Sequence, residues 1–94
     1  MSQLKVVWTS QFKKDYKAAI RSHLDINLLD KIIMNLANQE EFDPKYKDHP
    51  LSGNWKSFME CHIKADWLLI YKIESDKLIL TLAMAGSYSY LFWK

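Results

Sequence analysis

The chain has 94 residues, a formal net charge of +2 and a hydrophobic share of 49%. This length predicts one domain over residues 1–94, and the apolar share is ample for a packed core, which argues against a disordered chain. The single cysteine excludes an internal disulfide and fits a reducing compartment. No apolar run approaches the roughly 20 residues of a membrane-spanning helix, and the first residues lack the apolar region of an export signal. We therefore expect a cytoplasmic protein with no membrane association.

The first part of the chain predicts a strand followed by an amphipathic helix. Residues 4–8 are apolar and β-branched, which is typical of a strand. Thr9 or Ser10 can cap the helix that follows. Its apolar residues share one face: Phe12, Tyr16, Ala19 and Ile20. Its four cations, here called the basic stripe, fall mostly on the other face: Lys13, Lys14, Lys17 and Arg21. Such a stripe is by default a solvated surface, and contact with phosphate groups or an acidic partner is the functional alternative.

A second amphipathic helix is predicted directly afterwards. Asp25 can cap it, and apolar residues recur at helical spacing up to about residue 38: Ile26, Leu29, Ile32, Ile33 and Leu36. Two consecutive amphipathic helices with a short joint indicate a helical hairpin, whose apolar sides must pack on a sheet. His23 lies in the joint and is interpreted as an ordinary surface histidine.

The second part of the chain predicts a long loop and then three strands. Residues 39–53 are polar and contain both prolines; loops of this length in small domains often carry function. Residues 55–63 alternate, so that Glu60 and His62 share the face opposite Cys61. A turn at residues 64 and 65 would place His62 opposite Trp67. Further strands are predicted at 67–73 and 78–84, followed by an aromatic tail. The sequence therefore predicts an α+β fold.

Titratable side chains concentrate in the loop and the first of these strands. His49 and His62 are accompanied by several lysines, and imidazoles that titrate near neutrality suit acid–base chemistry on a polyanion. On composition alone, structural histidines are the stronger alternative. A metal site has little support because no HExxH or CxxC spacing is present. Cys61 and His62 are neighbours on a strand and point to opposite faces, so this imidazole does not activate the thiol.

Three motifs carry a family resemblance. D-H-x-L-x-G-x-W-K begins at Asp48, E-x-H-I-x-x-D-W-L-L-I-Y at Glu60, and G-S-x-S-x-L-F at Gly86. They resemble the YafQ branch of the RelE/ParE toxin superfamily, and the resemblance covers essentially the whole chain. It implies a RelE-like fold, with two N-terminal helices packed on a small antiparallel sheet with an N-terminal strand. It also implies the toxin of a type II toxin–antitoxin pair, a ribosome-dependent endoribonuclease that cuts mRNA without metal or cofactor.

The resemblance also implies partners and site residues. The partners are the ribosome, mRNA and a cognate antitoxin bound in a heterotetramer or larger assembly. The catalytic candidates are His49, His62, Asp66 and Tyr88, and the substrate-binding candidates are Lys56, Lys64, Trp67 and Phe92. RNA carries its own nucleophile, the 2′-OH, so the enzyme needs a base, an acid and cations for the phosphate. An aromatic ring among these residues would stack on a base, with core packing as the alternative.

Three positions depart from the family pattern. Met59 and Met84 stand where the family commonly has arginines, and Tyr88 stands where it commonly has a histidine. A phenol ordinarily titrates near 10 and an imidazole near 6.5, so we expect a weakened nuclease, although RelE-type toxins also use a C-terminal tyrosine in catalysis. The alternative is a non-catalytic toxin-fold protein that binds antitoxin or another protein such as gyrase, as in the ParE branch. In either case we expect the helical hairpin to leave the face bearing His62 open, with His49 close by.

Overall fold

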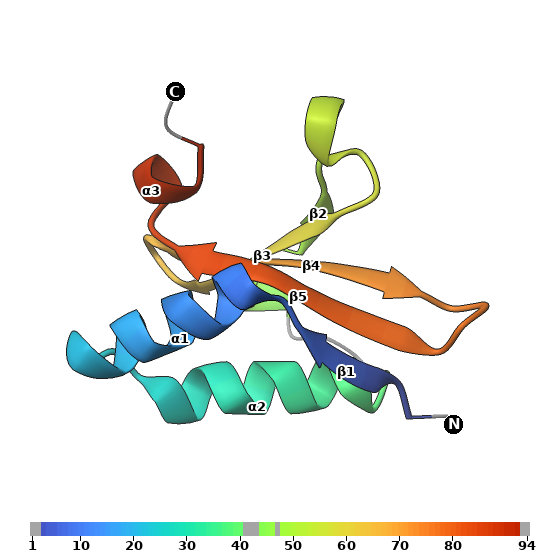
Figure 1. Ribbon diagram of the computed structural model, residues 1–94, viewed down its shortest axis with the longest axis horizontal. Helices are drawn as coiled ribbons and strands as arrows, with labels where there is room; N and C mark the ends of the chain where they lie inside the picture. The colour runs from blue at the N-terminus through green and yellow to red at the C-terminus, as the bar shows by residue number, and fades with distance from the viewer. Residues whose placement is uncertain (1–2, 41–43, 47, 93–94) are drawn as a thin grey trace.

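The computed structural model describes residues 3–40, 44–46 and 48–92. Two helices pack on one face of a five-stranded sheet, and a short third helix lies beyond the other face (Figure 1). The helices are α1 (Ser10–Arg21), α2 (Ile26–Ala37) and α3 (Tyr88–Phe92). The strands are β1 (Lys5–Trp8), β2 (His49–Pro50), β3 (Met59–Lys64), β4 (Trp67–Glu74) and β5 (Ile79–Gly86). The predicted α+β class, with two N-terminal helices on a mostly antiparallel sheet, is confirmed.

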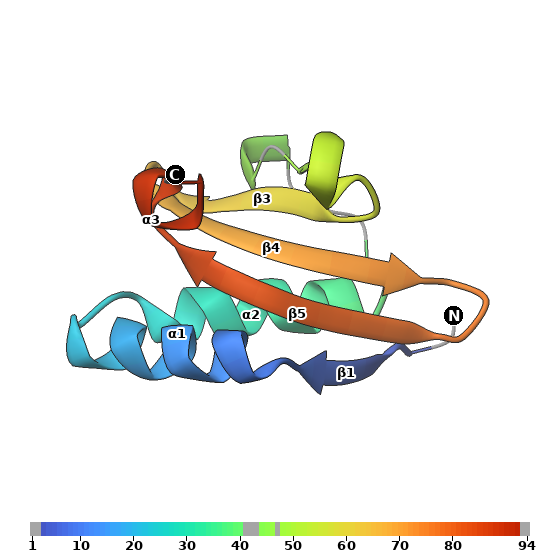
Figure 2. The ribbon, with the colours of Figure 1, turned by 45° about the horizontal axis from the view of Figure 1, so that its top comes forward.

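The sheet has the order β1-β5-β4-β3-β2. The pairs β2–β3, β3–β4 and β4–β5 are antiparallel, whereas β1 runs parallel to β5. The first strand of the chain therefore lies beside the last one, and α1 and α2 lead the chain across one face of the sheet, from β1 at one edge to β2 and β3 at the other (Figure 2). Among the described residues, no helix is long and apolar enough to cross a bilayer.

Side-chain caps start both long helices where the sequence predicted them. The hydroxyl of Thr9 accepts a hydrogen bond from the backbone N–H of Phe12 at 3.1 Å. The same hydroxyl donates to the carbonyl oxygens of β5: its oxygen lies 2.9 Å from the carbonyl oxygen of Leu82 and 2.8 Å from that of Ala83. Asp25 accepts from the N–H of Leu28 at 3.1 Å and caps α2. Thr9 thus ties the beginning of α1 to the middle of β5.

The helix-side face of the sheet carries the main core. Apolar side chains of α1 and α2, among them Phe12, Leu29 and Ile32, pack there on side chains of β3, β4 and β5. Ile20 was predicted to join them but is 51% exposed, because a step of about 100° from Ala19 turns it away from the sheet. The cations of the basic stripe are all exposed, as predicted.

The opposite face, called the open face below, carries a smaller apolar cluster. Its buried members are Leu68, Ile70, Ala83 and Leu91, the last of them from α3. Because side chains alternate along a strand, the pairing of His62 with Leu68 and of Glu60 with Ile70 places both titratable residues on this face. The prediction that the helical hairpin leaves the face of His62 open is confirmed.

The β3–β4 hairpin differs from the predicted one by one residue. Lys64 remains in β3 and pairs with Trp67, and the register shifts between His62 and Lys64. His62 therefore lies opposite Leu68, and the predicted pairing with Trp67 is wrong. This irregularity inserts one residue into β3, which the alternating pattern of the sequence does not reveal. Its consequence is that Trp67 points to the helix side, where it is 6% exposed.

The long loop and the tail contain short elements that the sequence did not predict. The loop holds two 3-10 turns, η1 (Pro44–Tyr46) and η2 (Gly53–Trp55), with β2 between them. The strand predicted from residue 55 begins only at Met59. The aromatic tail, for which no secondary structure was predicted, forms α3. Each element is too short for its hydrophobic periodicity to be recognised.

Candidate active site

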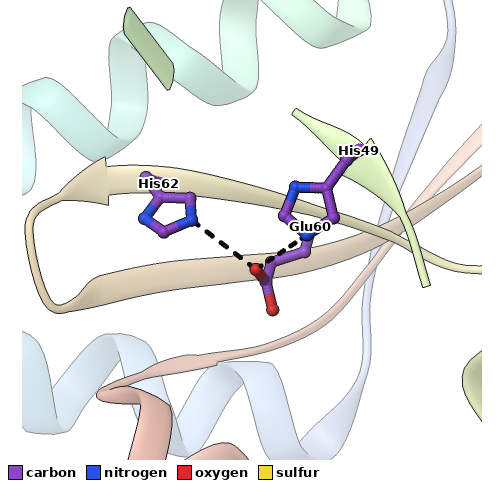
Figure 3. Close-up of side chains that lie close together, drawn as sticks. All are labelled: His49, Glu60 and His62. Carbon is purple, nitrogen blue, oxygen red and sulfur yellow. Dashed lines mark ion pairs between the residues drawn. The ribbon is translucent and has the colours of Figure 1, made fainter. Parts of the chain in front are cut away.

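The open face holds a compact group of two imidazoles and one carboxylate, the His–Glu–His cluster (Figure 3). His49 Nε2 lies 3.2 Å from Glu60 Oε1, and His62 Nε2 lies 3.6 Å from the same oxygen. The two rings lie on either side of this carboxylate, with centroids 6.2 Å apart. The Glu60 side chain is 7% exposed, against 47% for His49 and 31% for His62. The predicted proximity of the two histidines is confirmed, and Glu60 joins them.

Strand geometry explains why these three residues meet. Glu60 and His62 are two apart on β3 and therefore point to the same side. The two-residue strand β2 pairs antiparallel with β3 so that His49 lies directly opposite Glu60. The intervening Cys61 points to the other side, where it is 0% exposed. Burial is the main cause that raises the pKa of this thiol to about 12, so Cys61 is not available as a thiolate.

The cluster can move protons. A buried carboxylate needs donors to offset its lost hydration, and the imidazole nitrogens facing Glu60 can supply them. An imidazole that donates from one nitrogen presents the other as a proton acceptor, and a protonated imidazole is an acid. The partly exposed His49 and His62 can therefore act as a base and an acid toward a ligand on the open face.

The same three residues could hold a metal ion. One ligand atom from each of His49, Glu60 and His62 lies within 4.8 Å of the others. Two imidazoles and one carboxylate are typical ligands of Zn²⁺ and related transition metals. Motif spacing did not reveal this set, because only the pairing of β2 with β3 brings His49 to Glu60 and His62.

Asp66 and Tyr88 lie together at the turn end of the β3–β4 hairpin. The backbone N–H of Tyr88 donates to Asp66 Oδ1 at 3.1 Å, so this carboxylate caps the first residue of α3. Tyr88 itself is 62% exposed. The pairings of His62 with Leu68 and of Leu68 with Gly86 align the three strands, which places the start of α3 at the end of the sheet where His62 lies.

The predicted cationic residues are spread around the cluster and beyond it. Lys56 is exposed at the end of η2. Lys64 and His62 line one cavity of about 460 Å³ together with Lys45, and Lys64 Nζ also lies 4.0 Å from Asp25 Oδ2. The basic stripe lies on α1, which covers the helix-side face, so the structure does not bring it to the cluster (Figure 1).

One cation on the open face was not predicted. Lys72 Nζ lies 5.8 Å from the centre of the Phe58 ring, and Phe58 packs against the open-face cluster. Counting in steps of two along β4 from Ile70 would have found it, because Lys72 must point to the same side. Lys72 is therefore an additional candidate for contact with a phosphate.

The remaining predicted site residues have different surroundings. Trp67 is buried in the helix-side core, which leaves its ring no free face for stacking on a base. Phe92 ends α3, and its side chain lies outside what the structure describes. Met59 packs against the helix-side core, whereas Met84 packs against the open-face cluster. The open face is therefore apolar at Met84, where the family resemblance predicts an arginine.

Comparison with known proteins decides the family. Residues 4–93 match the family described as "Bacterial toxin of type II toxin-antitoxin system, YafQ". The chain belongs to the YafQ toxin family. The mRNA interferase toxin YafQ of Escherichia coli (strain K12) is 40% identical over 93 residues, which cover 98% of this chain and 99% of that relative.

Solved structures of YafQ-like toxins share the fold. A metal-bound toxin from Helicobacter pylori is 44% identical with a TM-score of 0.89, and the match covers 95% of this chain and 99% of that one. YafQ in the E. coli DinJ–YafQ toxin–antitoxin complex is 37% identical with a TM-score of 0.86, covering 96% of this chain and 98% of that one.

Proposed function

We propose that this YafQ-family chain is a ribosome-dependent endoribonuclease that cleaves mRNA. Its supports are the family, the name "mRNA interferase toxin" of a relative that is 40% identical, and above all the His–Glu–His cluster on the open face. A binding module does not require two imidazoles held about one buried carboxylate. A nuclease that works on a 2′-OH nucleophile needs a base and an acid, and two imidazoles can supply both.

The proposed reaction is a metal-independent transfer within the RNA chain. One imidazole removes the proton of the 2′-OH, whose oxygen attacks the adjacent phosphorus. The bond from phosphorus to the 5′-oxygen breaks, and that oxygen receives a proton from the acid. The products are a 2′,3′-cyclic phosphate and a 5′-hydroxyl end. Lys56, Lys64 and Lys72 offer positive charge for the crowded phosphate.

His49 and His62 are assigned the acid and base roles because they share Glu60. Asp66 is assigned to hold Tyr88 through the backbone N–H, and the phenol is assigned as a hydrogen-bond donor to the phosphate. A phenol is a weaker acid near pH 7 than an imidazole. The proposed enzyme is therefore slower than relatives with a histidine at this position.

The test is cleavage of an mRNA held in the ribosomal A site, with 5′ ends mapped on the product. His62→Ala and His49→Ala should each lower the cleavage rate by about 10²–10⁴-fold, the usual contribution of a general acid or base. His23→Ala is the matched control, because that histidine is exposed in the joint between α1 and α2. If the wild type cleaves mRNA and both cluster variants cleave it at the same rate, the assignment is overturned.

The cluster is also proposed to bind a divalent transition metal, as its ligand set allows and as the metal-bound H. pylori relative suggests. A metal held by His49 and His62 occupies the lone pairs that accept protons. Cleavage should therefore persist with a chelator selective for transition metals, with Mg²⁺ retained for the ribosome, and decline as Zn²⁺ or Cu²⁺ is added. A rate that vanishes with that chelator and returns with Zn²⁺ or Cu²⁺ would replace the metal-independent reaction with a metal-assisted one.

A cognate antitoxin is the second proposed partner, by analogy with the DinJ–YafQ complex of the E. coli relative. Antitoxin segments that fold on binding need a complementary surface, and the exposed basic stripe of α1 offers one. Neutralising the four cations of the stripe should weaken antitoxin or ribosome binding and flatten the salt dependence of that binding. These cations are Lys13, Lys14, Lys17 and Arg21. Unchanged binding would make the stripe a solvated helix face.

One observation favours the non-catalytic alternative. Met84 adds apolar surface to the open face beside the cluster, where a nuclease of this family would carry a cation. A protein that only binds antitoxin, or a target such as gyrase, could use that surface. It would inhibit growth without new mRNA 5′ ends, so the same mapping experiment separates the two functions.

A further inference from the structure

We propose that Asp15, a buried carboxylate on α1, is a positioning residue for the candidate active site: through the Tyr90 hydroxyl and the N–H of Ala85 it fixes α3, the helix that carries Tyr88. This inference rests on the proposed nuclease function for its effect on cleavage. The hydrogen bonds that carry it are independent of that function.

Asp15 lies on the inner face of α1 and is 6% exposed. Its Oδ2 accepts a hydrogen bond from the backbone N–H of Ala85 at 2.9 Å. Its Oδ1 accepts from the Tyr90 hydroxyl at 2.7 Å and from Gln11 Nε2 at 2.9 Å. These described donors are neutral, so the carboxylate is kept in the core by hydrogen bonds alone. Such an arrangement is strongly directional and fixes the donors as much as the acceptor.

Tyr90 is the link between Asp15 and α3. Its hydroxyl donates to Asp15 and accepts from Gln11 Nε2 at 2.8 Å, which closes a ring of three side chains. The hydrogen bond to Asp15 is the main cause that raises the pKa of Tyr90. Its aromatic ring covers Gly86 so closely that a Cβ there would meet Tyr90 Cδ2 at 2.5 Å. No side chain other than hydrogen at position 86 leaves the ring in place.

The helix α3 is thus held at three points. Tyr90 reaches to the α1 side of the sheet, and Leu91 is buried in the open-face cluster. The N–H of Tyr88 is held by Asp66. Figure 2 shows α3 at the end of the sheet, beyond β5 and next to the β3–β4 turn. The placement of α3, and with it of the exposed Tyr88, is therefore set in part by a carboxylate on the opposite side of the sheet.

The test compares two matched pairs of variants. Tyr90→Phe and Asp15→Asn break the proposed anchor. Tyr16→Phe and Asp30→Ala break a bond of the same kind and length, between Tyr16 OH and Asp30 Oδ1 at 2.7 Å, which joins α1 to α2 and does not touch α3. Tyr90→Phe removes a single hydroxyl, so it keeps the test valid if Asp15→Asn does not fold.

Single-turnover cleavage in the ribosomal A site is the first measurement. The anchor variants should lower the maximal rate by about 10–100-fold, as misplacement of a group by about 1 Å can do, with the half-saturating toxin concentration changed less than about twofold. In a Tyr88→Phe background the same variants should have a much smaller effect, because they act through Tyr88. Equal losses in both backgrounds, or equal losses in the control pair, would overturn the positioning role.

Amide hydrogen exchange of Tyr88, Tyr90 and Leu91 is the second measurement. It should accelerate in Tyr90→Phe and stay unchanged in Tyr16→Phe. Should the wild type cleave no RNA, the proposed function fails, and this exchange still decides the anchor. Unchanged exchange in Tyr90→Phe would overturn it.

Discussion

Replacing Gly86 by alanine gives the sharpest test of how α3 is placed. The added Cβ would lie 2.5 Å from Cδ2 of Tyr90, 3.1 Å from Cε2 and 3.4 Å from Cγ. Separations below 3.0 Å are essentially absent from real proteins, so the ring must move. Restoring an ordinary contact of 3.4 Å requires a shift of about 0.9 Å, about the size that removes a hydrogen bond.

The energetic effect follows from this shift. Overpacking by one methyl group typically costs about 1–3 kcal/mol. If the ring moves along its hydroxyl direction, the 2.7 Å bond to Asp15 lengthens to roughly 3.6 Å and is lost. We therefore expect Gly86→Ala to lower the free energy of unfolding by about 1–3 kcal/mol. The assay is equilibrium urea unfolding, followed by tryptophan fluorescence and fitted with a common slope.

A double variant shows whether the clash is the cause. Combining Gly86→Ala with Tyr90→Ala removes the ring that the methyl group meets, so the pair should be less destabilised than the sum of its single effects. Gly53→Ala is the control: nothing lies within 4 Å of its Cβ, and its cost of about 1–2 kcal/mol comes from the φ of +64°. That cost should be independent of Tyr90. A Gly86→Ala protein as stable as the wild type, with α3 unchanged in its amide spectrum, would refute the reasoning.

Three further predictions concern chemistry and stability. Tyr88→His should raise A-site cleavage by up to about 10²–10⁴-fold, the range of a matched general acid. If the wild type is already fully toxic and Tyr88→His does not change the cleavage rate, the phenol is itself competent in catalysis. Cys61, whose pKa burial raises from 9.0 to about 12, should hold about 10³-fold less thiolate at pH 8 than an ordinary thiol. Its alkylation should therefore be slow in the native state, faster as pH rises, and rapid in urea; fast native reaction would contradict its burial. Thr9→Ala should destabilise the fold by about 0.5–2 kcal/mol as a lost cap, measured by urea unfolding with Ser10→Ala as the control; equal stability of the two variants would deny the cap.

The sequence predicted those elements of the fold that have a repeating hydrophobic pattern. The helical periodicity of α1 and α2, and the caps at Thr9 and Asp25, were sufficient to locate both helices. Alternation along β3 was sufficient to predict that His62 and the buried Cys61 point to opposite faces of the sheet. These patterns extend over several residues, so hydrophobic burial determines them without knowledge of distant partners.

The candidate site was predicted less completely, for physical reasons. The strand β2 consists of two residues, His49 and Pro50, and only pairing with β3 makes it a strand. Glu60 was noticed as a neighbour, but its bridging position depends on that pairing. Asp15 was missed altogether, although an acidic residue between Phe12 and Ala19 on the apolar face of a helix signals a buried partner. That partner lies 75 residues further along the chain.

The β1–β5 pairing determines when the protein can fold. Residues 5–8 form a strand only beside residues 79–86, and the Thr9 hydroxyl bonds to a carbonyl 73 residues away. Contacts of such long sequence separation form late, and during translation the N-terminal partner must wait for the C-terminal one. Both the strand that closes the sheet and α3, which carries Tyr88, are synthesised after the other helices and strands. The proposed nuclease site is therefore complete only after residues 79–92 have left the ribosome that makes them.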